Sequence, residues 1–125
     1  MLVEAIKEQQ AQIEELKSKI DFAFLALHGA LGEDGTIQGL LKLADIPFVG
    51  CGVLGSCVGM DKDITKRLLR DSGINVAPWI TLTKSNADIW NYKSASKKLG
   101  NVLFVKPANA GSSVGVNKVI SEKEF

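Results

Sequence analysis

A glycine-rich segment between a short apolar run and a helical pattern is the feature that most constrains the fold. The apolar run, residues 21–27, has the length of a buried strand, and apolar residues from Ile37 onward have helical spacing. The segment between them, residues 28–36, contains three glycines that allow sharp backbone turns. Strand, loop and helix in this order predict an α/β unit with parallel strands. Such units bind ligands at the carboxyl ends of their strands.

The rest of the first half fits the same unit. Residues 2–20 form an amphipathic helical pattern, which we expect to pack against the sheet, because one short stretch falls below the roughly three or four heptads that indicate a coiled coil. Pro47 ends the second helix, and a short strand is expected at residues 48–49. Four glycines in residues 50–59 predict a break and a domain boundary near Gly59. The apolar stripe of the first helix consists of Leu2, Ile6, Ile13, Leu16 and Ile20.

The second half indicates a separate unit of α+β character. A helix opens at Asp61, and Gly73 suits its C-terminal cap. Residues 76–82 are expected to form an edge strand, because they carry Pro78, which cannot donate a ladder hydrogen bond.

A helix and two strands are expected in the remaining part of this unit. Ser85 and Asp88 have the spacing of a capping box for a helix that ends at Gly100. A strand is expected at residues 102–105, followed by a loop at 107–113 and a returning strand at 114–120. Residues 121–125 are expected to be the start of a helix.

Composition and charge exclude some classes of function. The chain is 46% hydrophobic and 23% charged, which is typical of a globular protein. A net charge of +1 argues against a nucleic-acid or membrane-surface binder, and no apolar run approaches the ~20 residues that span a bilayer. Residues 1–59 carry 4 lysines and 8 acidic residues, a net of −4, whereas residues 60–125 carry 11 basic and 6 acidic residues, a net of +5. This asymmetry fits either a difference between two surfaces or a second half that handles an anion.

The cysteines and the N-terminus indicate a cytoplasmic protein. Cys51 and Cys57 match neither a C-x-x-C redox motif nor a zinc-binding pattern, so we expect two reduced, partly buried thiols and no metal ligands. Residues 1–20 have no unbroken apolar core and are not expected to be a signal peptide.

The glycine-rich segment also carries the most specific motif. Taken singly, His28 fits a polar residue at a strand end, and Glu33 and Asp34 fit solvated loop charges. The N-terminus of the following helix favours an anion such as a carboxylate. The whole string, HGALGEDGTIQG, resembles the H-G-x-x-G-E-D-G-x-[aliphatic]-Q-G signature of D-alanine–D-alanine ligases, and every specified position matches.

Two further motifs lie in the second half. A lysine that ends a buried strand, Lys106, needs an anionic or hydrogen-bonding partner, because burial of an unpaired ammonium group is unfavourable. The Gly-Ser-Ser-Val-Gly turn that follows can direct N–H groups at phosphates, although a hairpin turn without a ligand explains its spacing equally well. Together these motifs resemble the phosphate-binding strand and loop of ATP-grasp ligases, and the Met-Asp-Lys sequence ending at Lys62 resembles that of the same ligase family.

The resemblance implies roles for individual residues. Lys62 and Lys106 would contact the nucleotide phosphates, and the loop containing Ser112 would close over the γ-phosphate and the substrate carboxylate. The candidate catalytic residues are His28, Glu33 and Ser112, and the candidate ATP-binding residues are Lys62, Lys106, Gly111, Ser112 and Ser113.

The resemblance further implies a domain assignment and a reaction. Residues 1–59 would be the second half of the parallel-sheet pre-ATP-grasp domain, and residues 60–125 the first lobe of the ATP-grasp domain. In the resembled family, ATP phosphorylates the carboxylate of one D-alanine, and the amine of a second attacks the acylphosphate, for peptidoglycan synthesis. A ligase that makes D-Ala–D-Ser or D-Ala–D-lactate, another ATP-grasp enzyme and a non-catalytic nucleotide-binding remnant are the alternatives.

Several functional residues of the resembled family have no match in this chain. They include a substrate-orienting glutamate, a specificity loop, an arginine and the ligands of Mg²⁺ or Mn²⁺. We therefore expect a fragment, inactive alone, of a cytoplasmic and homodimeric ligase that acts on D-alanine and ATP and binds neither nucleic acid nor membranes.

Overall fold

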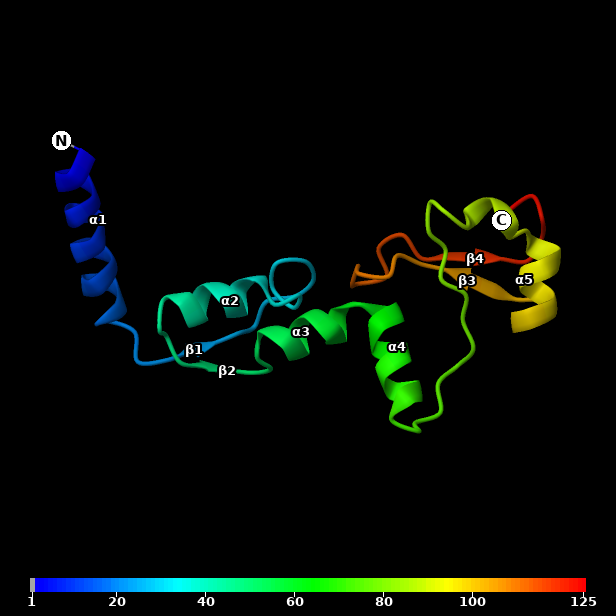
Figure 1. Ribbon diagram of the computed structural model, residues 1–125, viewed down its shortest axis with the longest axis horizontal. Helices are drawn as coiled ribbons and strands as arrows, with labels where there is room; N and C mark the ends of the chain where they lie inside the picture. Colours follow the sequence, from blue (N-terminus) through cyan, green and yellow to red (C-terminus); the bar gives the residue numbers. More distant parts are fainter. Residues whose placement is uncertain (1) are drawn as a thin grey trace. The chain divides into compact units, whose positions relative to one another are not determined.

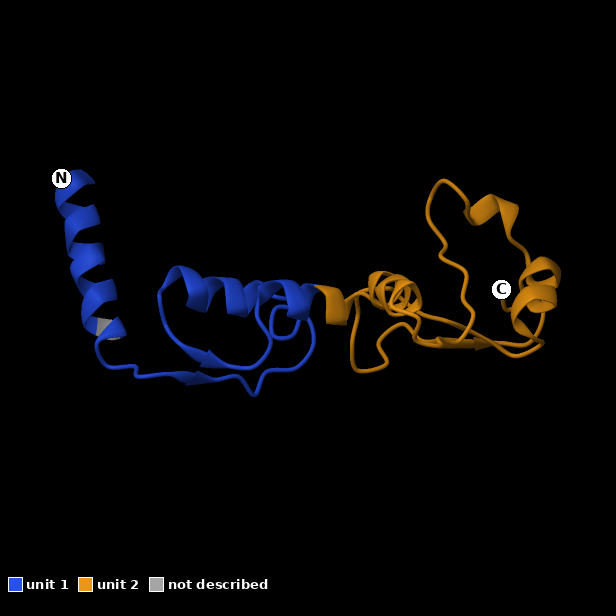
Figure 2. Cartoon of the chain, turned by 60° about the horizontal axis from the view of Figure 1, so that its bottom comes forward, with its two compact units in different colours: residues 1–57 blue, residues 58–125 orange. Residues whose placement is uncertain are grey.

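The computed structural model describes residues 2–125, apart from the side chain of Leu16, as a mixed α/β chain with two compact units (Figure 1). Unit 1 is Met1–Cys57 and unit 2 is Val58–Phe125, so the division falls within one helix (Figure 2). Unit 1 contains α1 (Leu2–Lys17), β1 (Ala23–Phe24), α2 (Thr36–Leu43) and β2 (Phe48–Val49), and the division falls within α3 (Val53–Met60). Unit 2 continues with α4 (Lys62–Asp71), the 3₁₀ helix η1 (Ala87–Ile89), α5 (Tyr92–Leu99), β3 (Leu103–Val105) and β4 (Asn117–Val119).

The strands of unit 1 pair in parallel, as the order of elements predicts. Ala23 lies opposite Phe48 and Phe24 opposite Val49, and α2 connects the two strands. Only two residues of the predicted strand 21–27 pair, because β2 supplies only two partners before Gly50, whose φ of 138° turns the backbone away.

The helix α1 does not pack against the sheet, so that expectation is wrong. Ile6 is 57% exposed and Ile13 is 48% exposed. A pair of two-residue strands offers a face too small to cover a helix of 16 residues. The predicted position of Leu16 in the apolar stripe concerns a side chain outside the described residues.

Most of the glycine-rich segment, residues 53–59, lies in the helix α3, where the sequence predicted a break. Glycine in a helix interior is unfavourable by roughly 1 kcal/mol relative to alanine, so local propensity does not explain α3. Contacts with the glycine-rich loop stabilise it instead: the Cys57 thiol donates a hydrogen bond to the carbonyl of Asp34, 3.0 Å away. Cys51 and Cys57 are free and exposed, and the predicted partial burial is wrong.

Helix α4 begins as predicted. Asp61 is its N-cap, and its carboxylate accepts hydrogen bonds from the N–H groups of Asp63 and Ile64, both at 2.9 Å. At the other end the C-cap is Ser72, and Gly73 follows with a φ of 77°, the left-handed conformation that ends many helices.

The core of unit 2 lies between α5 and an antiparallel hairpin. β3 and β4 pair with Leu103 opposite Val119, and these two side chains are buried with Ala95 of α5. The capping box of α5 is formed by Asn91 and Ser94 rather than by Ser85 and Asp88. Ser85 precedes the separate helix η1, and Asp88 lies within it. The partly buried side chains that pack on this core are Ile80, Trp90, Tyr92 and Leu99.

Two predicted elements of unit 2 are not formed. Residues 76–82 are extended but are not a strand, and no backbone–backbone hydrogen bond involves them in the described structure. Pro78 lacks an N–H group, and the hairpin pairs only with itself, so no ladder includes this segment. Residues 121–125 form turns rather than the start of a helix.

Candidate functional site

The loop of residues 28–36 is braced by its own acidic side chains. Glu33 accepts a hydrogen bond from the N–H of Gly29 at 2.5 Å. The carboxylate of Asp34 accepts from the N–H groups of Leu31, at 2.8 Å, and Thr36, at 3.0 Å. These bonds span two to four residues, so the motif itself encodes the shape of the loop.

Gly35 and Gln38 tie the loop to the elements around it. Gly35 has a φ of 95°, and a Cβ on it would meet the sulfur of Cys57 and lie 2.9 Å from the carbonyl oxygen of Val53. Gln38 is 5% exposed, and its Nε2 donates to the carbonyl of Gly32 at 2.9 Å. A side chain at position 35 therefore does not fit, and the buried amide fixes the loop on α2.

The start of α2 is less open to an anion than the sequence suggests. Its N–H groups at Thr36 and Ile37 already donate to Asp34 and to the carbonyl of Leu31, respectively. Hydrogen bonds from the N–H of Leu31 and then from Thr36 hold the pKa of Asp34 below its ordinary value. Asp34 thus occupies the position of the expected ligand.

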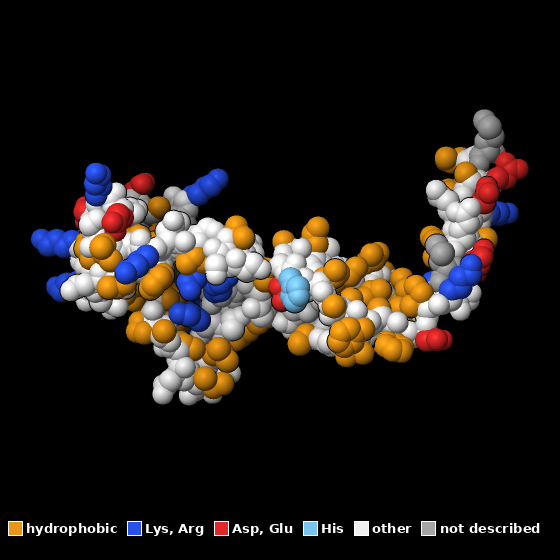
Figure 3. Space-filling model, turned by 180° about the vertical axis from the view of Figure 1, so that it is seen from behind, with side chains coloured by type: hydrophobic (Ala, Val, Ile, Leu, Met, Phe, Trp, Pro, Cys, Tyr) orange, Lys and Arg blue, Asp and Glu red, His pale blue; other side chains and the backbone are white. Residues whose placement is uncertain are grey.

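The first candidate catalytic residues lie in this loop. His28 is exposed, and the single histidine lies open at the surface (Figure 3). Glu33 is also exposed, with one oxygen held by Gly29. The third candidate, Ser112, belongs to unit 2.

In unit 2, Lys62 connects the start of α4 to the loop between β3 and β4. Its backbone N–H donates to the carbonyl of Ala108 at 2.8 Å, and its ammonium donates to the carbonyl of Ala110 at 2.5 Å. The structure thereby brings together the Met-Asp-Lys motif and the Gly-Ser loop, which are 46 to 48 residues apart in sequence.

The turn at residues 111–115 has an unusual backbone. Ser112 and Ser113 adopt left-handed φ angles of 52° and 59°, which are uncommon for residues with side chains. Within the described structure, neither serine N–H donates a hydrogen bond, and both residues are exposed. Consecutive free N–H groups in such a turn can bind an anion.

Unit 2 also contains a groove of about 660 Å³, whose lining includes Lys106 and Ala108 but not the turn at residues 111–115. Its lining includes the lysines Lys62, Lys66 and Lys106 together with apolar side chains of the hairpin and of residues 77–82. A volume of roughly 300–1,000 Å³ with an apolar lining and a few charged groups is typical of small-molecule sites. Lys106 is exposed, so the predicted burial of this lysine is wrong, although the lysine does face the groove. The strand β3 that leads to it is exposed at Phe104 and Val105, because only Leu103 packs inward.

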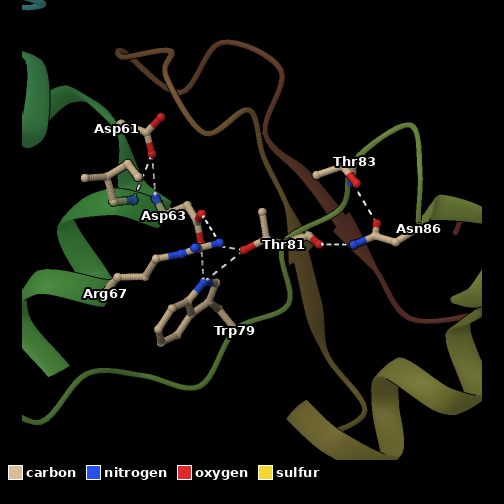
Figure 4. A network of polar contacts seen from close by, with 8 residues as sticks. Asp61, Asp63, Arg67, Trp79, Thr81, Thr83 and Asn86 are labelled. Atoms are coloured by element: carbon tan, nitrogen blue, oxygen red, sulfur yellow. Dashed lines mark hydrogen bonds and ion pairs between the residues drawn. The ribbon is translucent and has the colours of Figure 1, made fainter. Parts of the chain in front are cut away.

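The sequence prediction missed a polar network in the same unit. Asp63 accepts hydrogen bonds from Trp79 and Thr81 and pairs with Arg67 (Figure 4). Hydrogen bonds from Thr81 and Trp79, followed by Arg67, lower the pKa of Asp63. An acidic residue in the first turn of a helix is common, so the sequence offered no signal for this network.

Metal ligands and membrane spans are absent from the described residues. No group of three or more His, Cys, Asp or Glu side chains there could hold a metal ion. In the same part of the chain, no helix combines the length and apolarity that crossing a membrane requires.

Two sequence profiles match the chain in order. The profile described as D-ala D-ala ligase N-terminus matches residues 2–51, and the one described as D-ala D-ala ligase C-terminus matches residues 68–125. D-alanine–D-alanine ligase A of Escherichia coli K12 is 57% identical over 106 residues, which are 85% of this chain and 29% of the relative. The chain therefore spans about a third of the length of this relative.

Solved structures show the same similarity. A D-alanine–D-alanine ligase from Bacillus anthracis in complex with ATP matches with a TM-score of 0.71 at 43% identity. The match covers 91% of this chain and 37% of the ligase chain. The VanG D-Ala:D-Ser ligase from Enterococcus faecalis matches with a TM-score of 0.73 at 44% identity. The match covers 83% of this chain and 30% of the VanG chain.

The two profiles and the mixed α/β fold define the class of the protein: a chain related to enzymes that are named as amino-acid ligases. More narrowly, the chain belongs to the D-alanine–D-alanine ligase family.

Proposed function

We propose that this chain is the part of an ATP-dependent D-alanine–D-alanine ligase that carries one substrate loop and one phosphate loop. Residues 1–59 correspond to the second half of the pre-ATP-grasp domain, and residues 60–125 to the first lobe of the ATP-grasp domain. The enzyme joins two D-alanines for peptidoglycan synthesis and acts in the cytoplasm as a homodimer.

The observation that carries this proposal is the groove of unit 2. Three lysines in its lining supply positive charge for phosphates, and the apolar lining suits a base and sugar. The turn at residues 111–115 is outside this lining, but it belongs to the same hairpin and its serine N–H groups can donate to an anion. The net charge of +5 in residues 60–125 favours the approach of an anion. A related ligase of known structure carries ATP, which supports the same ligand here.

The reaction transfers the γ-phosphoryl group of ATP to the carboxylate of the first D-alanine. The amine of the second D-alanine then attacks the carbonyl carbon, the C–O bond to phosphate breaks, and the amine loses a proton. The products are D-alanyl-D-alanine, ADP and phosphate. Lys62 and Lys106 neutralise phosphate charge, and the turn with Gly111, Ser112 and Ser113 covers the phosphoryl group and keeps water from the acylphosphate.

The loop of unit 1 serves the amino-acid substrate. His28 is open to solvent and available to a ligand, whereas Glu33 holds the loop through the N–H of Gly29. Mg²⁺ or Mn²⁺ would support phosphoryl transfer, but no group of side chains among the described residues fits a metal site.

A D-Ala–D-Ser ligase is the second candidate. The similarity to VanG, whose second substrate is named as D-Ser, supports it. The motifs of this chain are common to both activities.

ATP binding to the chain tests the groove. Calorimetric titration of ATP should give a dissociation constant that rises about tenfold or more in Lys106→Met, because a charge-assisted contact to phosphate is lost. Lys118→Met is the matched control, since Lys118 is exposed on the neighbouring strand β4 and does not line the groove. Equal ATP affinity in the two variants would contradict the role proposed for Lys106.

A chimera tests the ligase activity. This chain replaces the matching 106-residue segment of the E. coli relative, and phosphate release is measured with and without D-alanine. Release that depends on D-alanine supports the proposal. A folded chimera that binds ATP but releases no phosphate would contradict it and favour a non-catalytic nucleotide-binding remnant.

A further inference from the structure

One wall of the groove in unit 2 is held by side chains rather than by secondary structure. Residues 77–82 line the groove, but no backbone–backbone hydrogen bond involves residues 75–82 in the described part of the chain. Side-chain hydrogen bonds to the segment come from Asp63 and Lys66 of α4 and from Asn86, and Ile80 of the segment packs on the core of unit 2. The shape of this wall therefore depends on a few side chains.

Asp63 makes the largest share of these contacts. Its Oδ1 accepts from the indole N–H of Trp79 at 2.8 Å and from the hydroxyl of Thr81 at 2.5 Å. Its Oδ2 pairs with the guanidinium of Arg67 at 2.8 Å. Figure 4 shows both donors of the segment converging on this one carboxylate. The Asp63 side chain is 14% exposed, so water competes little for these bonds.

The ring of Trp79 is fixed by the same helix. The ammonium of Lys66 lies 5.4 Å from the ring centroid, and the guanidinium carbon of Arg70 lies 5.7 Å from it. Asp63, Lys66 and Arg70 occupy positions i, i+3 and i+7 of α4 and so share one helix face. This face contacts the indole of Trp79 in two ways. Asp63 accepts a hydrogen bond from the indole N–H, and the two cations lie over the ring.

The residue before Asp63 contacts a second segment that contributes to the groove lining. Lys62 donates to the carbonyls of Ala108 and Ala110 in the loop between β3 and β4, and both Lys62 and Ala108 line the groove. Two consecutive residues at the start of α4 thus connect to two segments that line the same groove.

We propose that Asp63 is a positioning residue for nucleotide binding, which holds residues 79–81 on α4 and so keeps the groove in the shape that accepts ATP. This inference rests on the proposed function. Asp63 is itself part of the groove lining, and the role proposed for it is exerted through its hydrogen bonds from Trp79 and Thr81. The lowered pKa of Asp63 agrees with this role, because the ionised carboxylate is the form that accepts both bonds.

The test compares Asp63→Asn with Asp71→Asn in the full chain. Both variants change one carboxylate of α4 to an amide, but Asp71 is 65% exposed and, among the described residues, its side chain pairs with the neighbouring Arg70. We expect ATP to bind about tenfold more weakly to Asp63→Asn, which is the effect of losing a hydrogen bond to a charged group. Asp71→Asn should bind ATP like the wild type. Thr81→Val, which removes one donor and keeps the carboxylate, should weaken binding about threefold.

The indole N–H resonance supplies a readout specific to positioning. The chain has two tryptophans, and Trp79→Phe assigns their signals. Asp63→Asn should shift the ¹⁵N–¹H resonance of Trp79 and leave that of Trp90 in place, and Asp63→Glu should restore part of both the shift and the ATP affinity.

The outcomes separate this inference from the proposed function. If the wild type binds ATP and Asp63→Asn binds it with the same affinity, the inference alone is overturned. The comparison requires that the amide signals of the hairpin are intact in the variant. A wild-type chain that binds no ATP overturns the proposed function and this inference with it. Weaker binding together with the Trp79 shift supports both.

Discussion

The two units stabilise their candidate binding loops in different ways. In unit 1, Glu33 and Asp34 bond to N–H groups two to four residues away, and the loop folds largely on itself. In unit 2, the groove depends on Lys62 and Asp63, whose partners lie 16 to 48 residues away. A loop made of local bonds survives in a unit with little core, whereas a groove made of distant bonds requires the core beneath it. Unit 2 has such a core in Ala95, Leu103 and Val119.

Gly35→Ala should have the largest effect and should act on unit 1. A left-handed φ with a side chain, plus the clash with Cys57 and Val53, should destabilise the unit by about 3 kcal/mol. Urea unfolding followed by circular dichroism measures the change. Gly39→Ala is the control, because a Cβ there meets nothing within 4 Å and a helical alanine should stabilise by about 0.5 kcal/mol. Similar midpoints for the two variants would show that the loop does not need its contact with α3.

Val119→Ala should have the next largest effect and should act on unit 2. Val119 is 1% exposed, and the loss of two methyl groups from the core should cost about 2 kcal/mol. Val114→Ala, at a position that is 66% exposed in the same hairpin, should change stability little. If the groove of unit 2 requires the core beneath it, Val119→Ala also weakens ATP binding, and Val114→Ala does not.

Asn91→Ala should have a smaller effect on the same unit. Asn91 caps α5 by accepting from the N–H of Ser94 at 2.9 Å, and loss of an N-cap costs about 1 kcal/mol. Thermal unfolding measures the loss, and Asn91→Ser should recover most of it. An equal loss in the serine variant would assign the effect to something other than the cap.

Acid should have the smallest effect, confined to the loop of unit 1. The pKa of Asp34 is lowered in the folded state, so the loop bonds are complete above the ordinary value of 3.8 and are lost as pH falls below it through the folded pKa. The amide resonances of Leu31 and Thr36 should therefore stay in place down to about pH 4 and move together as the pH falls further. In Asp34→Asn this coupled movement should disappear; its persistence would mean that another group titrates.

Much of the fold was predictable from local patterns. The parallel pairing of β1 and β2, the start of α2 at Thr36 and the N-cap of α4 at Asp61 follow from short-range signals. Three expectations failed where distant contacts or their absence decided the outcome: the helix α3, the unpaired residues 76–82 and the exposure of α1.

The candidate site divides in the same way. The HGALGEDG loop was recognisable from its motif, and the structure shows that Glu33 and Asp34 hold it through local hydrogen bonds. The link between Lys62 and Ala110 and the network around Asp63 were not predictable, because a first-turn lysine or aspartate has the same local preference with or without a partner.

The sequence by itself determined the family, the order of the elements and the shape of the loop at residues 28–36. These depend on motif identity and on bonds between near neighbours, which the order of residues specifies directly. Only the tertiary structure decided that Lys62, Lys106 and residues 77–82 line one groove and that Lys106 is exposed. Such facts depend on which surfaces are buried together, and burial is a property of packing between segments distant in sequence.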